Sequence, residues 1–168
     1  ALATGDRSMH AETRNIDFGA FSNIFFFSGD RLYVGRYGCR RCSEGGASIA
    51  VLDRGTLEQV GDIPIAPDDN EYQDAIRSIA ADENRIYASI EYRYEQAGRP
   101  NFVVIDKGSL KILKKTHVDA PSSLIVENGR LLACSCSFTE DQSCFALDPM
   151  TTRTAGESTA TCAPADGM

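Results

Sequence analysis

The chain has 168 residues, which suits one domain with its own hydrophobic core. Its net charge of -7 and pI near 4.8 argue against nucleic acid and anionic membrane surfaces, because both require a basic face. The longest apolar run, Ile24 to Phe27, is far shorter than the roughly 20 residues that cross a bilayer, so no membrane span is expected.

Three segments share a turn, then an arginine, then an apolar strand. They are residues 29–34, 83–88 and 128–133, and each follows another apolar strand, at 24–27, 76–80 and 123–126. After each comes a strand that ends in Asp, then a tight turn and a further strand, at 49–57, 102–110 and 144–152. An Asp in this place can accept hydrogen bonds from turn N–H groups, so these three Asp residues are expected to be structural.

The repeating unit therefore has four strands, and its arginines lie 54 and then 45 residues apart (Arg31, Arg85 and Arg130). Four strands in every 40–50 residues or so are typical of β-propeller blades. The sequence predicts an all-β, propeller-like fold of three four-stranded blades. They are expected over residues 20–154 (about 20–65, 72–118 and 120–154), between a flexible segment, 1–19, and a C-terminal tail, 155–168.

The repeats resemble those of YVTN-type β-propellers, the surface-layer and quinoprotein-like group. The resemblance is carried by residues 30–35, 49–53 and 61–65 (DRLYVG, IAVLD and GDIPI) and covers roughly residues 20–153. The third repeat departs from the pattern, because Leu132 replaces the tyrosine and the segment after Thr151 is polar. The resemblance implies a fold and no particular activity, since this family contains enzymes, adhesins and scaffolds.

Propellers usually have about four to eight blades, so three blades predict a partial propeller or half of an assembled one. Three open blades would leave apolar faces at both ends. The chain is then a fragment of a longer protein, one of two copies that close a ring, or a partner of a different chain. Self-association or a partner chain is favoured over a free monomer.

The long connections should all leave the blades on one face, and loops on a rigid scaffold are where binding usually occurs. Arginine and tyrosine often make the strongest contacts at such surfaces. The predicted binding residues on this long-loop face are Arg36, Tyr37, Arg40, Arg41, Asp68, Asp69, Glu71, Tyr92, Arg93, Tyr94 and Arg99. The alternative for each loop is a plain solvated surface. The acidic segment that ends at Asp74 suggests calcium, but its spacing matches no EF-hand loop, and a solvated loop is favoured.

All six cysteines are predicted to form disulfides (Cys39, Cys42, Cys134, Cys136, Cys144 and Cys162), because an even number suits an oxidising compartment. A local bridge between Cys39 and Cys42 is favoured over a redox pair and over a zinc site shared with Cys134 and Cys136. The pairing in the third repeat stays open, although hairpin neighbours are suitable and Cys162 would staple the tail.

Hydrolase chemistry finds little support. There are two histidines, His10 and His117, and Ser48 lies in a predicted strand rather than a nucleophile elbow. The predicted function is therefore a non-catalytic periplasmic or extracellular module that binds a protein or a small polar ligand, with no metal or cofactor. The alternative, which the resemblance implies, is a subunit or fragment of a quinoprotein-like or lactonase-like enzyme.

Overall fold

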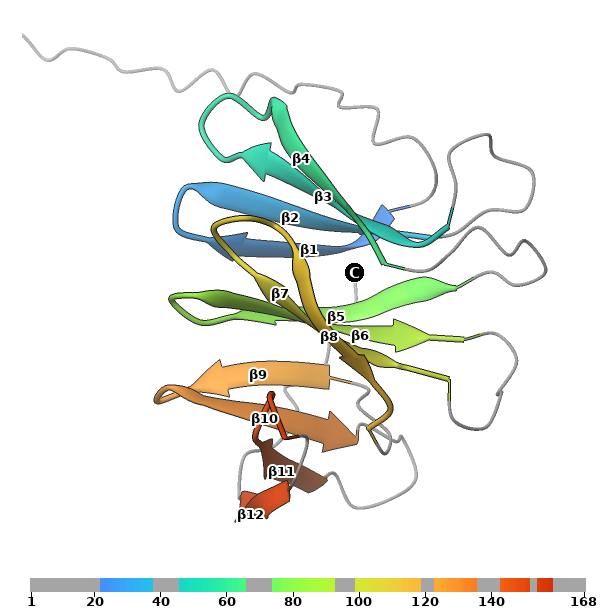
Figure 1. Cartoon of the computed structure of the whole chain (residues 1–168). Coiled ribbons are helices and arrows are strands. Elements are labelled where there is room, and N and C mark those ends of the chain that lie inside the picture. Colours follow the sequence, from blue (N-terminus) through green and yellow to red (C-terminus); the bar gives the residue numbers. More distant parts are fainter. Residues whose placement is uncertain are drawn as a thin grey trace, which may run out of the picture.

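The computed structural model describes residues 22–37, 46–65, 74–92, 99–118, 123–135, 143–151 and 154–158. These residues form twelve strands, and none of them lies in a helix. The strands make three antiparallel sheets of four strands each, in which sequence neighbours pair (Figure 1). The all-β class predicted from the sequence is therefore confirmed.

The first sheet contains β1 (Ser22–Ser28), β2 (Arg31–Arg36), β3 (Ser48–Asp53) and β4 (Gln59–Pro64), in that order. The two central strands are almost entirely buried, whereas β4 is mostly exposed. Strands covered on both faces read as continuous apolar runs, which explains why the sequence shows no alternation in its central strands.

The second sheet repeats this plan with β5 (Ala75–Ala81), β6 (Arg85–Glu91), β7 (Phe102–Asp106) and β8 (Ile112–Thr116). Alternate residues of β6 point to opposite faces, as the period of a strand requires. Ile86 contributes to the core shared with the first sheet, and Tyr87 contributes to the core shared with the third. The second sheet is thus the middle layer.

The third sheet contains β9 (Ser123–Glu127), β10 (Arg130–Ser135), β11 (Ser143–Leu147) and β12 (Thr154–Ser158). Strand β12 reaches Ser158, four residues past the end expected for the third blade at residue 154. The polar sequence of β12 gives no strand signal, and its pairing with β11 supplies the backbone partners instead.

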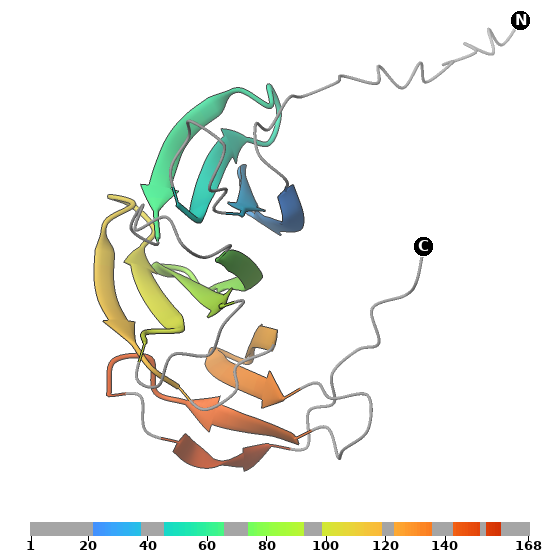
Figure 2. The same cartoon turned by 90° about the vertical axis from the view of Figure 1, so that its right-hand side faces the viewer.

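The sheets stack face to face through two separate cores. Tyr33, Ile49 and Ile76 are among the fully buried residues between the first and second sheets. Tyr87 and Phe102 lie in the core between the second and third, with their rings stacked at 6.4 Å. The first strands of the three sheets, β1, β5 and β9, contact one another in turn, so the sheets follow an arc (Figure 2).

The two ends of the sheets differ. Tight turns close one end, here called the turn end, and the strands lead into long connections at the other, the loop end (Figure 1). This confirms the predicted separation of short and long connections. At the turn end, Asp53, Asp106 and Asp148 each accept backbone hydrogen bonds of 2.7–3.2 Å from their own turns. Their predicted structural role is confirmed.

Candidate functional site

A buried ion pair lies at the loop end of the second sheet. A guanidinium nitrogen of Arg99 is 3.0 Å from a carboxylate oxygen of Asp74, and the two side chains are 14% and 4% exposed. The Nδ1 atom of His117 lies 3.1 Å from the carbonyl oxygen of Arg99. The sequence favours a solvated loop for the acidic segment. Its last residue, Asp74, instead turns inward and pairs with Arg99.

Further contacts fix the same region. The guanidinium carbon of Arg99 lies 4.3 Å from the ring centre of Tyr92, whose hydroxyl donates to the carbonyl oxygen of Pro100. The Asn101 amide group bonds both the N–H and the carbonyl of Val118, each at 2.8 Å. These residues stand where the connections 66–73, 93–98 and 119–122 join the sheet. The attachment points of three connections are thus bonded to one another.

Arg36 lies at the loop end of the first sheet. Its Nη2 atom is 3.0 Å from Oε1 of Gln59 and 3.3 Å from Oδ1 of Asp62, both on β4. Its side chain is 16% exposed, so these contacts across the sheet hold it in place. Tyr37 follows directly and is half-buried. Among the predicted binding residues that the structure describes, Tyr92 and Arg99 come together, whereas Arg36 and Tyr37 are on another sheet.

The remaining predicted binding residues lie outside the described residues, as do four cysteines: Arg40, Arg41, Asp68, Asp69, Glu71, Arg93, Tyr94, Cys39, Cys42, Cys136 and Cys162. In the third sheet, Cys134 and Cys144 form a disulfide between directly opposed positions of β10 and β11, with Cα atoms 4.1 Å apart. This confirms one predicted bridge between hairpin neighbours. It also excludes Cys134 from a zinc site, because its sulfur is not a thiolate.

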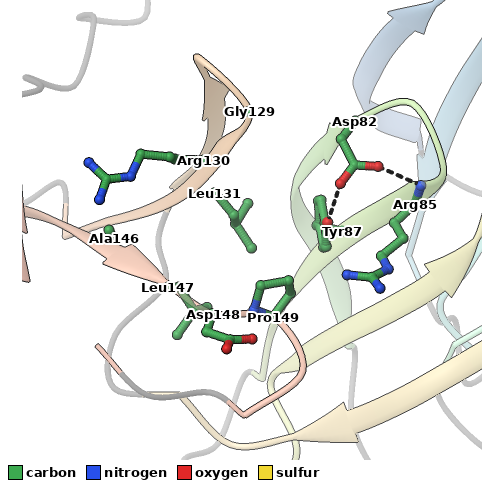
Figure 3. A pocket seen from close by; sticks show the side chains of 10 residues that line it. All are labelled: Asp82, Arg85, Tyr87, Gly129, Arg130, Leu131, Ala146, Leu147, Asp148 and Pro149. Atoms are coloured by element: carbon green, nitrogen blue, oxygen red, sulfur yellow. Dashed lines mark hydrogen bonds between the residues drawn. The ribbon is translucent and has the colours of Figure 1, made fainter. Parts of the chain in front are cut away.

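A pocket of about 260 Å³ opens at the turn end, between the second and third sheets (Figure 3). Its acidic, basic and apolar lining comes from three turns and the strands beside them: Asp82, Arg85, Tyr87, Gly129, Arg130, Leu131, Ala146, Leu147, Asp148 and Pro149. The guanidinium of Arg130 points away from the other side chains, as Figure 3 shows. Sequence reasoning placed function at the loop end and missed this pocket, although Arg85, Arg130 and Asp148 belong to the repeated pattern.

Hydrogen bonds fix the protonation states in the pocket. The Oδ1 atom of Asp82 accepts the N–H groups of Asn84 and Arg85 at 2.8 and 2.7 Å, and Oδ2 accepts the Tyr87 hydroxyl at 2.5 Å. Burial raises the pKa of Asp82, but these hydrogen bonds outweigh burial, and the pKa is lowered overall. Burial and the bond to Asp82 raise the pKa of Tyr87 to about 12.

Asp82 is therefore ionised and Tyr87 protonated at neutral pH, an arrangement suited to holding a polar group rather than transferring protons. Within the described ranges, no three His, Cys, Asp or Glu side chains gather as a metal site would need. The same ranges contain no helix with the length and hydropathy to cross a membrane.

Comparison with known proteins gives little further information. No protein-family model matches the chain, and no curated protein matches it. A solved structure of hydrazine synthase from Kuenenia stuttgartiensis aligns with 79% of the chain at 11% identity and a TM-score of 0.32. The chain spans 47% of that protein's length. Similarity at this level shows neither a shared fold nor a shared activity.

Proposed function

We propose that this chain is a non-catalytic binding or assembly module that works outside the cytosol. In this proposal it forms three consecutive blades of a β-propeller and recognises a partner through its loop end. The observation that carries the proposal is the buried pair of Asp74 and Arg99. It ties together the attachment points of connections that are far apart in sequence, so the loops start from a rigid platform.

The propeller part of the proposal draws support from the arrangement of the sheets. Each is a four-stranded meander, and neighbouring sheets pack face to face through buried cores. On the outer face of the first sheet, Phe25 and Phe27 are 51% and 57% exposed. A further blade, from a longer chain, a second copy or another protein, would cover these rings.

The location is supported by the disulfide between Cys134 and Cys144. Disulfides persist in oxidising compartments and are rare in the cytosol. A periplasmic or extracellular module is thus the best match for this chain.

Site-specific crosslinking in the native host tests the proposal. A photo-crosslinking residue at Tyr94, between the braced attachment points, is compared with one at Gly108 in an exposed turn at the opposite end. We expect defined crosslinked products from position 94 and few from position 108. Equal products from both positions would overturn the proposal that the loop end binds a partner. A metal or cofactor that co-purifies in stoichiometric amount would overturn the non-catalytic role and favour a catalytic subunit.

Light scattering on a sizing column tests how the blades are completed. A molar mass near twice the chain's 18.2 kDa would support two copies that close one ring. A monomer whose outer phenylalanines are protected from labelling only in the presence of a host extract would instead support a different partner chain.

A further inference from the structure

Lys107 fills the turn end between the first and second sheets. It follows Asp106 in the turn after β7, and its ammonium group donates to two oxygens. One is the Ser28 hydroxyl on the first sheet, at 2.9 Å, and the other is the Asp82 carbonyl on the second, at 3.1 Å. The first junction between sheets thus holds a primary ammonium group that the chain itself provides.

The second junction has an equivalent aspartate turn but lacks this group. Asp148 binds its turn as Asp106 does, so Pro149 takes the place of Lys107. Asp82 takes the place of Ser28, because Ser28 pairs with Arg31 in the first sheet and Asp82 bonds Arg85 in the second. A proline cannot donate a hydrogen bond, and the pocket of about 260 Å³ opens here.

The charge of the acceptor also changes between the junctions. Where Lys107 meets the neutral hydroxyl of Ser28, the second junction offers the Asp82 carboxylate. A charge-assisted hydrogen bond to a carboxylate is stronger than one to a hydroxyl. Arg85 also lines the pocket, and its positive charge helps to lower the pKa of Asp82, so a bound ammonium would share this carboxylate with the guanidinium.

We propose that this pocket binds the primary ammonium group of an alkylamine, with the Asp82 carboxylate as its acceptor. The alkyl stem lies against the apolar part of the lining, which Leu131, Leu147 and Pro149 provide (Figure 3). A small amine and a lysine side chain of a partner protein share this chemistry. The site is at the end opposite the proposed partner-binding loops, so it stands or falls independently of them.

Titration calorimetry with n-butylammonium chloride at neutral pH is the direct test, with 1-pentanol as the uncharged control. We expect saturable binding of the amine, no binding of the alcohol, and affinity weakened about tenfold or more in Asp82→Asn. Asparagine keeps an oxygen for the N–H groups of its turn but loses the oxygen that accepts the Tyr87 hydroxyl, so circular dichroism checks the fold of the variant. Equal affinity in this variant, or equal binding of the alcohol, would overturn the proposal.

A second pair of variants supplies the missing group within the chain. In Pro149→Lys the new ammonium should occupy the pocket, abolish butylammonium binding and raise the melting temperature above that of Pro149→Met, which has a similar length and no charge. In the Asp82→Asn background this difference should disappear. Undiminished amine binding by Pro149→Lys would show that the ammonium site is elsewhere and the proposal wrong.

The source of the amine is decided with Nα-acetyl-lysine methylamide as a second probe. If it binds as well as butylammonium, the pocket accepts a lysine side chain from a partner. If butylammonium alone binds, the ligand is a free small amine. Binding of neither probe contradicts the proposal.

Discussion

Gly35 on β2 lies where the first sheet packs closely against the second. A Cβ atom added at this position would be 2.9 Å from Cβ and 3.0 Å from Cγ2 of Ile76, which is fully buried on β5. Ordinary contact begins at 3.4 Å, so Gly35→Ala would have to separate the two strands by about 0.5 Å. Neither contacting atom is at the flexible end of a side chain, so the backbone must move.

A gap of this size weakens dispersion contacts across the whole interface, and overpacking of this kind costs about 1–3 kcal/mol. Urea unfolding followed by circular dichroism measures the change. The matched control is Gly108→Ala, since the nearest atom to its Cβ would be an aspartate oxygen at 3.7 Å, and we expect it to be neutral or slightly stabilising. If the two variants unfold at the same urea concentration, the two sheets do not pack this closely at Gly35.

Three other perturbations give distinct results. Asp74→Asn should cost about 3 kcal/mol, because its arginine partner is buried, whereas Glu91→Gln breaks an exposed ion pair and should cost under about 1 kcal/mol in the same urea assay. Replacing Cys134 and Cys144 together with alanine should lower the free energy of unfolding by about 2–4 kcal/mol, and an unchanged melting curve would contradict this. Hydrogen bonds from its turn hold the pKa of Asp106 below the ordinary value. The ionised Asp106 carboxylate therefore stabilises the folded state above about pH 3.9, and this contribution is lost as the pH falls through the lower pKa of the folded state. Urea midpoints measured from pH 6 to 3 should fall less steeply in Asp106→Asn.

Local signals in the sequence predicted most of the fold. Apolar runs such as Ile24 to Phe27 fall within strands, and the arginine that follows each tight turn opens the next strand. The aspartates at the second turn bind backbone N–H groups as expected. Each of these features depends on a few neighbouring residues, and residue type and spacing describe such short-range interactions well.

The features that the sequence did not predict depend on residues far apart in the chain. Strand β12 is expected only from the repeat, since its own residues are polar, and it extends to Ser158 because the edge of β11 offers hydrogen bonds. The inward turn of Asp74 requires Arg99, which is 25 residues away. The pocket requires the turn of the second sheet that begins at Asp82 to meet two turns of the third. No local pattern encodes these meetings, because the stacking of the sheets creates them.

Comparison of equivalent positions in the repeats separates structural from functional roles in this chain. Where the repeats agree, as at Asp53, Asp106 and Asp148, the side chain has a local task that every sheet needs. Where they differ, the common fold does not require the particular residue, and a change there needs its own explanation. The exchange of Lys107 for Pro149 is such a change, and a pocket beside an ionised carboxylate lies at this junction. A proline at this position would suit the turn whether or not a carboxylate lay beside it. The space that Pro149 leaves beside the Asp82 carboxylate has a use if an amine occupies it.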